Sequence, residues 1–166
     1  MAGWVALLRA VNVGGIKVLM EDLRTLAQRE GFADARTYIA SGNLILQSDL
    51  AEAEIAAKLE AALAKRYGRP MGVIVRSGAA LAKVVADNPF ADQPGNKLAA
   101  LFTDRAVTLD GVRRAEAGEQ VVAGEGVLYI WYPEGMGRSK LVVPAGRDGT
   151  ARNMNTVARL AELAAD

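Results

Sequence analysis

The chain has 166 residues and a formal net charge of +1, which suits one domain or two small ones and excludes a global field that would draw the protein onto nucleic acid or a membrane. Cysteine and histidine are both absent, which excludes disulfides, thiolate nucleophiles and metal sites built from these residues. Any chemistry would therefore depend on Ser, Lys, Asp, Glu or Tyr, or on a metal such as Mg²⁺ held by carboxylates. Composition leaves open whether the protein is an enzyme, and it identifies neither a cofactor nor a metal site.

The first predicted element is a buried strand over residues 4–10. The N-terminal segment is apolar but has no basic leader, and Arg9 interrupts it far short of a signal peptide's apolar region or a membrane span. We therefore expect a cytoplasmic protein with no membrane partner. Both alternating sets of side chains in this strand are apolar, so we expect the second face of its sheet to be covered by the C-terminal half or by another subunit.

The next elements predict a ferredoxin-like arrangement over residues 1–76. Apolar residues at helical spacing predict a helix from Leu19, and Gly31 stands where a glycine that ends a helix belongs. There follow a strand over 36–40, the turn Ser41-Gly-Asn43, a strand over 44–47, a helix over 51–67 and a strand over 71–76. This βαββαβ order is typical of the ferredoxin-like sandwich, so we predict an α+β fold.

The ferredoxin-like topology has a consequence for two loops. In that arrangement the first and second strands are parallel, with the third strand antiparallel between them. The loop after the first strand, residues 12–17, and the turn at residues 41–43 therefore belong to the same edge of the sheet. We expect them to be neighbours in space.

Residues 77–166 predict a second, less regular α+β half packed on the first. The predicted elements are a helix capped by Ser77, a strand over 98–102, a short helix over 109–115, hairpin strands over 120–123 and 127–132, and a final helix that ends at Ala164. The βαββα order resembles that of the first half. This suggests a degenerate duplication, although no residue-level repeat supports one.

The first candidate binding segment follows the first strand. It contains Arg9, Asn12, Gly14, Gly15 and Lys17. Glycines let backbone N–H groups approach a ligand, the following helix N-terminus favours negative charge, and the lysine adds a positive charge. The spacing is not that of a Walker loop. The alternative interpretation is a strand-to-helix turn that simply needs flexible residues.

The second candidate is the turn Ser41, Gly42 and Asn43. Taken alone it is better explained as a hairpin turn, and only its predicted closeness to the first segment favours a binding role.

The third candidate lies near the start of the C-terminal helix, where Arg152, Asn153 and Asn155 form a dense set of hydrogen-bond donors. We place Arg152, Asn155, Thr156 and Arg159 on one polar helix face. The alternative is a polar helix surface that only confers solubility.

Ser139 and Lys140 are also candidates. A serine nucleophile beside a lysine base is one interpretation, but neighbours in sequence usually point in different directions. We favour a helix cap followed by a surface lysine.

Four segments resemble those of a known family. They are Leu7-Leu-Arg-Ala-Val-Asn-Val-Gly-Gly15, Thr37-Tyr-Ile-Ala-Ser-Gly-Asn43, Arg138-Ser-Lys140 and Thr150-Ala-Arg-Asn-Met-Asn-Thr156. In this order, and over essentially the whole chain, the sequence resembles the bacterial family called domain of unknown function 1697. The resemblance implies an α+β fold of ferredoxin-like character. It implies no activity, substrate, cofactor or catalytic residue.

These segments include the candidates chosen on physical grounds, so we predict a shared site in a binding module for an anionic ligand. The ligand is either a nucleotide-like small molecule or a nucleic-acid backbone. One alternative is a structural protein that forms a homodimer through an apolar sheet face. A less favoured one is an enzyme that holds a phosphorylated substrate with Arg9, Lys17 and Arg152.

Overall fold

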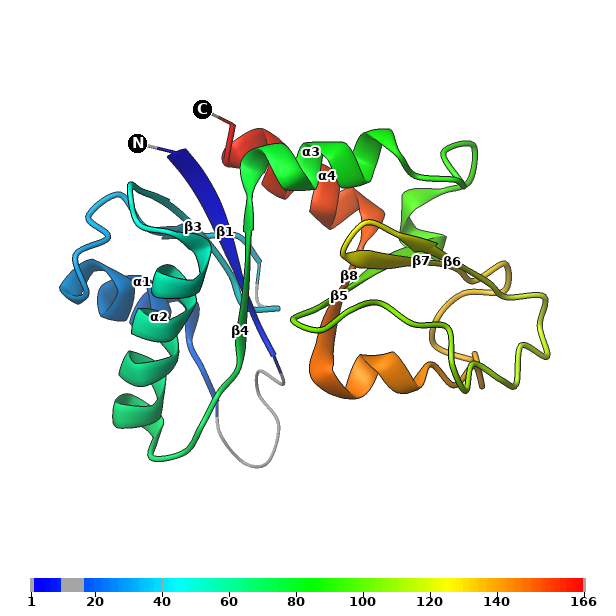
Figure 1. Ribbon diagram of the computed structural model, residues 1–166, viewed down its shortest axis with the longest axis horizontal. Coiled ribbons are helices and arrows are strands. Elements are labelled where there is room, and N and C mark those ends of the chain that lie inside the picture. Colours follow the sequence, from blue (N-terminus) through cyan, green and yellow to red (C-terminus); the bar gives the residue numbers. More distant parts are fainter. Residues whose placement is uncertain (1, 10–16, 40, 166) are drawn as a thin grey trace. The chain divides into compact units, whose positions relative to one another are not determined.

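The computed structural model describes residues 2–9, 17–39 and 41–165 (Figure 1). The described residues form two four-stranded antiparallel sheets with helices, which confirms the predicted α+β class. The chain divides into a first unit, Met1–Leu81 with Leu160–Asp166, and a second unit, Ala82–Arg159. The chain passes between the units within helix α3 (Gly78–Ala86) and within helix α4 (Met154–Leu163).

The first unit contains the predicted βαββαβ arrangement. Its elements are β1 (Ala2–Leu8), α1 (Met20–Arg29), β2 (Arg36–Thr37), β3 (Asn43–Ser48), α2 (Glu52–Tyr67) and β4 (Val73–Ser77). The strand order is β2-β3-β1-β4, and every neighbouring pair is antiparallel. Strands β1 and β2 are therefore parallel to each other with β3 between them, as the ferredoxin-like topology predicts.

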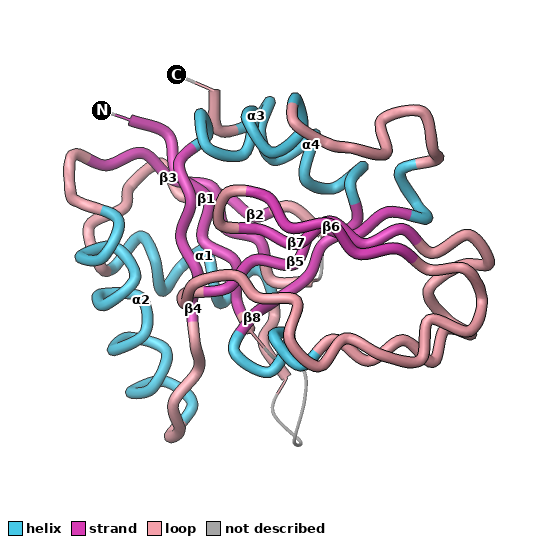
Figure 2. The backbone as a smooth tube through the Cα atoms, turned by 45° about the vertical axis from the view of Figure 1, so that its right-hand side comes forward, coloured by secondary structure: helices cyan, strands magenta, loops and turns pink. Residues whose placement is uncertain are grey.

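Helices α1 and α2 lie on one side of this sheet in both backbone views (Figure 1, Figure 2). Ile55, Leu59 and Leu63 recur at i, i+4 spacing on α2 and are fully buried, so this helix presents one apolar stripe to the sheet. Gly31 and Gly68 have φ angles of 99° and 74°, and each ends the preceding helix in the left-handed conformation that glycine tolerates.

The opposite face of the sheet is buried as well. Val5, Leu7 and Ile45 on this face have at most 3% of their surface exposed. The last turn of α4 joins the sheet, because Arg36 Nη2 donates a hydrogen bond to the Leu163 carbonyl at 2.6 Å. Side chains on both faces of the first strand are thus buried, and the covering of its second face by the C-terminal half or by another subunit stays a prediction.

The second unit repeats the strand topology of the first. Its strands are β5 (Leu98–Thr103), β6 (Gln120–Gly124), β7 (Val127–Trp131) and β8 (Gly149–Asn153). They are ordered β6-β7-β5-β8, again with every neighbouring pair antiparallel. When the strands of each unit are numbered in chain order, both sheets have the order second, third, first, fourth. The duplication suggested by the element order therefore has a structural counterpart.

Residues 104–119 connect β5 to β6, and residues 132–148 connect β7 to β8. In the first unit the corresponding connections contain α1 and α2. The two connections of the second unit contribute Val107, Leu141 and Val143 to the apolar cluster on this sheet. The two segments are joined by an antiparallel bridge, in which Arg113 N donates to the Val142 carbonyl at 3.1 Å and Val142 N to the Arg113 carbonyl at 2.8 Å. Loops and the short 3-10 helix Pro144–Asp148 thus take the place of α-helices as the cover of this core.

Two predicted elements and one predicted helix face are wrong. The helix expected over 109–115 does not form, because Gly111 and Arg114 adopt positive φ angles of 75° and 63°. The second strand ends at Thr37 rather than at residue 40, because Ile39 turns into the left-handed region at φ 51°. Arg152 is not on a helix face, since it belongs to β8 and α4 begins at Met154.

Within the described residues, helices long and apolar enough to cross a membrane are absent.

Candidate functional site

The end of β1 meets the turn between β2 and β3. Leu7 is paired with Asn43, and Leu8 N donates a hydrogen bond to the Gly42 carbonyl at 2.9 Å. The end of β1 and the second candidate are therefore neighbours, whereas the predicted closeness of the loop at residues 12–17 to this turn stays a prediction, because most of that loop lies outside the described residues. Asn12, Gly14 and Gly15 lie outside the described residues, and Lys17 is exposed just before α1.

The side chain of Asn43 organises this turn. Asn43 is fully buried, and its Nδ2 donates to the Tyr38 carbonyl at 2.9 Å and to Ser41 Oγ at 2.8 Å. Gly42 has a φ of 85°, which suits glycine, whereas Ile39 holds a left-handed φ of 51° that a β-branched residue rarely adopts. The described polar contacts of the amide hold the turn together, and its contact with a ligand remains a prediction.

Arg9 lies against the start of β4. Its backbone N donates to the Gly72 carbonyl at 2.9 Å. Its side chain runs over the same residue, since a Cβ atom built on Gly72 would come 2.9 Å from Arg9 Cδ and 3.1 Å from Nη1. Glycine at position 72 therefore allows the guanidinium to lie close to the backbone.

Arg9 also lines a surface groove of about 680 Å³ in the first unit. Its lining residues are Arg9, Ala57, Glu60, Ala61, Ala64, Arg69, Pro70, Met71 and Gly72. The small side chains come from α2 at i, i+4 and i+7 spacing, which leaves room above the helix. The groove is therefore lined by two arginines, one glutamate and six small or apolar residues.

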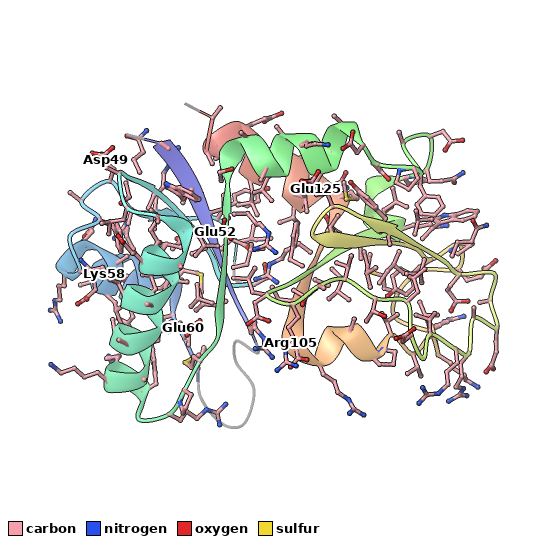
Figure 3. The ribbon with its side chains drawn as sticks, in the orientation of Figure 1. Asp49, Glu52, Lys58, Glu60, Arg105 and Glu125 are labelled. Atoms are coloured by element: carbon pink, nitrogen blue, oxygen red, sulfur yellow. The ribbon has the colours of Figure 1, made fainter. Side chains whose placement is uncertain are left out.

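Glu60 is the acidic residue of this groove. Its Oε1 accepts a hydrogen bond from Val73 N at 3.1 Å. The carboxylate therefore also pairs with the backbone N–H of the first residue of β4. Figure 3 shows Glu60 on α2, on the side nearer to β4. One of its oxygens is thus already engaged by the protein.

Glu60, Arg69 and Gly72 were not candidates from the sequence. The available signal was the run Arg69-Pro-Met-Gly72 directly after a helix with small residues at helical spacing.

Ser139 lies in the second unit, where its hydroxyl donates to Glu119 Oε2 and accepts from Leu141 N at 3.2 Å. Glu119 is buried, and its Oε1 accepts from Ala117 N at 2.7 Å. The hydrogen bond from Ser139 is the main reason that the pKa of Glu119 is lowered. The preferred interpretation of Ser139 as a helix cap is therefore wrong: it ties residues 117–119 to residues 139–141. Lys140 is exposed.

Arg152 is buried on β8, and its Nη1 donates to Thr150 Oγ1 at 2.5 Å and to the Ala151 carbonyl at 2.9 Å. Burial lowers its pKa to about 10, because desolvation disfavours the charged guanidinium.

The two asparagines that follow Arg152 in the sequence, Asn153 and Asn155, lie at the start of α4. Asn153 Oδ1 accepts from Thr156 N at 2.9 Å, as an N-cap residue does, and Asn155 packs against Gly95.

Fold and site together define an α+β protein with one strand topology repeated in two sheets and an arginine-lined groove in its first unit. The chain belongs to the family described as protein of unknown function (DUF1697), whose model matches residues 1–129. Its structure is similar to that of the conserved bacterial protein SP0830 from Streptococcus pneumoniae, with a TM-score of 0.77 and 23% sequence identity over 98% of each chain. That likeness concerns the fold. No curated protein matches the chain.

Proposed function

We propose that the protein is a binding module for an anionic small molecule, and that the ligand lies in the groove between α2 and the start of β4. The observation that carries the proposal is that Arg9 and Arg69 line one groove together with alanine, proline and methionine side chains. Groups of this kind together suit a ligand with an anionic end and an apolar body.

The charges of the groove favour an anion. Arginine stays protonated at neutral pH, and its fork of N–H donors matches the oxygens of a carboxylate or phosphate. Glu60 is the acidic lining residue, and one of its oxygens already accepts from Val73 N. By formal charge, the two arginines exceed the one glutamate and leave the lining with a net charge of +1.

The size of the groove favours a small molecule over a nucleic-acid backbone. Its volume of about 680 Å³ lies within the range of roughly 300–1,000 Å³ typical of small-molecule sites. Ala57, Ala61 and Ala64 offer apolar side chains to the body of such a ligand. A nucleotide-like molecule has both an anionic group and a base that can pack against apolar side chains.

A second groove of the first unit is less suitable. It measures about 560 Å³ and is lined by charged residues of both signs from α1 and α2. Arg66 and Asp22 in its wall already lie 4.0 Å apart as an ion pair. Its formal charge of +1 equals that of the first groove, but only Leu26 and Ala62 of its lining are apolar, so it offers less surface to the apolar body of a ligand.

The proposal is tested by measuring the melting temperature with nucleoside phosphates, dicarboxylates, inorganic phosphate and single-stranded oligonucleotides, followed by titration calorimetry of any that stabilise the fold. We expect a nucleoside phosphate to raise the melting temperature and to bind with a shallow salt dependence. Arg9→Gln and Arg69→Gln should each weaken binding about tenfold or more, because each removes charge-assisted hydrogen bonds. Arg24→Gln, which changes an exposed arginine outside the groove, is the matched control.

If none of these anions stabilises the protein, or if Arg24→Gln weakens binding as much as the groove variants do, the proposal is wrong. A steep salt dependence with oligonucleotides would instead favour the nucleic-acid backbone as the ligand.

A further inference from the structure

The sequence contains two aspartates that are followed directly by glycine, Asp110 and Asp148, and both lie in the second unit. Such a pair can react within its own main chain, because glycine has no side chain to hinder the approach of its backbone nitrogen to the carboxyl group. The nitrogen bonds to Cγ of the aspartate, and the carboxyl hydroxyl leaves with the amide proton as one water molecule. A second water opens the resulting succinimide ring at either carbonyl, which gives back aspartate or gives isoaspartate. The reaction needs no enzyme, oxidant or reductant.

The peptide group that joins Asp110 to Gly111 is not held in place. Both residues are exposed, and they form the centre of a turn in which Val112 N donates to the Leu109 carbonyl at 3.2 Å. Across the part of the chain that the structure describes, neither the Asp110 carbonyl nor the Gly111 N–H makes a hydrogen bond. This peptide group can therefore rotate and bring Gly111 N toward the Asp110 carboxyl group.

The contacts around this pair hold only the peptide groups on either side. Asp110 N donates to Thr108 Oγ1 at 3.1 Å, and Arg113 Nη1 donates to the Gly111 carbonyl at 3.0 Å. The Asp110 carboxylate has no ion pair or hydrogen bond with any described residue. Both reacting atoms, Gly111 N and Asp110 Cγ, are thus unengaged, while the flanking contacts keep the ends of the turn close together.

The second pair, Asp148 and Gly149, is restrained at both reacting groups. Gly149 N donates to the Gly146 carbonyl at the end of the 3-10 helix that precedes β8. Gly149 is also the first residue of β8, where it pairs with Thr103. The Asp148 carboxylate lies 3.6 Å from Arg105 Nε. Cyclisation here would break the hydrogen bond of the glycine nitrogen and disturb the start of a strand.

We propose that Asp110 is a site of spontaneous isomerisation in the folded protein, and that the fold protects Asp148 from the same reaction. The product is isoaspartate at position 110, in which the main chain runs through Cγ and is one methylene group longer. The added methylene group lies in the connection that Arg113 joins to Val142. Isoaspartate is also the chemical group that isoaspartyl methyltransferases modify with S-adenosylmethionine, which provides a direct readout.

The test compares the two pairs within one protein. Full-length wild type is incubated at neutral pH and physiological temperature, both folded and unfolded in urea, until the unfolded chain carries isoaspartate at both positions. Peptide mass spectrometry with electron-transfer fragmentation then locates isoaspartate, which has the same mass as aspartate. We expect several-fold more isoaspartate at residue 110 than at residue 148 in the folded protein. In the unfolded chain the difference should shrink, because the restraints on Gly149 are gone.

Three variants test the chemistry in the folded state. Asp110→Glu keeps the charge, but it should lose most methyltransferase labelling, because glutamate must form a six-membered ring, which closes much more slowly. Asp148→Glu is the matched control and should be labelled as strongly as wild type. Asp110→Asn should acquire isoaspartate faster than wild type, because the side-chain amide is lost as ammonia and is a better leaving group.

Two results from the wild-type protein overturn the proposal. One is isoaspartate at residue 148 of the folded protein in amounts equal to those at residue 110. The other is a folded protein that stays unmodified at residue 110 while the unfolded chain is modified there. Labelling that persists in Asp110→Glu also overturns it, provided that circular dichroism shows the variant to be folded. If that variant does not fold, the comparison within wild type decides the question.

Discussion

Arg9 and Gly72 are in van der Waals contact at the start of β4, where a Cβ atom on Gly72 would come 2.9 Å from Arg9 Cδ. The Arg9 backbone N also donates to the Gly72 carbonyl at 2.9 Å. The main chain of β1 is thus joined to that of β4 at the point where the arginine side chain enters the groove. This contact makes the position of one guanidinium sensitive to a single methyl group.

Gly72→Ala should weaken anion binding while leaving the fold nearly as stable. The added methyl group would also come 3.1 Å from Arg9 Nη1, and the far end of a flexible side chain moves aside at little cost. The guanidinium would then move away from its position in the groove. The affinity for the anion should fall about tenfold or more, because that is the loss expected when one charge-assisted hydrogen bond is removed. Gly137→Ala, where a Cβ meets no atom within 4 Å, is the control for calorimetry and thermal unfolding. Unchanged affinity in Gly72→Ala would show that Arg9 does not hold the ligand from this position.

Glu60→Gln should strengthen anion binding by roughly a few-fold at low salt, because it removes the negative charge of the groove. A glutamine Oε1 still accepts a hydrogen bond from Val73 N, so the start of β4 should keep its structure. The gain should shrink as ionic strength rises, since exposed charges are screened. Titration at two salt concentrations measures both effects, and Glu54→Gln on an exposed position of α2 outside the groove is the control. Weaker binding would mean that Glu60 itself contacts the ligand.

The stability lost in Ser139→Ala should depend on pH. The pKa of Glu119 is lowered in the folded protein, chiefly by the hydrogen bond from Ser139. A carboxyl group whose folded pKa lies below its unfolded value of about 4.3 stabilises the fold above that value, and the contribution is lost as the pH falls through the folded pKa. Ser139→Ala should therefore melt below wild type at neutral pH, and the difference should narrow in acid.

The control for this pH series is Ser77→Ala. Ser77 Oγ accepts a hydrogen bond from Ala80 N at 3.0 Å at the start of α3, a contact between uncharged groups. Its melting difference from wild type should stay constant over the same range. If the Ser139→Ala difference is equally constant, the ionised carboxylate of Glu119 is not the partner that matters.

Asn43→Asp should destabilise the first unit by about 2 kcal/mol or more. The change replaces a buried amide donor by a carboxylate, so the Tyr38 carbonyl loses its partner at 2.9 Å and a charge is left buried. Asn96→Asp makes the same chemical change at an exposed position of the second unit and should have little effect. Urea unfolding followed by circular dichroism compares the two. Equal stability of both variants would show that the Asn43 amide does not hold the turn.

Most of the first unit was predictable because its signals are local. The stripe of Ile55, Leu59 and Leu63 defines one helix face, and Gly31 defines the end of the preceding helix. The second unit was harder, because residues 104–119 have no helical stripe long enough to form a helix alone. Their conformation follows from the pairing of Arg113 with Val142, a contact between residues far apart in sequence.

For the candidate site, the sequence alone determined the βαββαβ order, and with it the meeting of β1 with the turn at Gly42. It also identified Arg9 as a candidate. Only the tertiary structure placed Arg9 beside Arg69 in one groove and Ser139 against Glu119. The physical reason is that periodicity and turn chemistry act between near neighbours in the chain. Which distant side chains share a cavity depends on how packed elements bring their ends together.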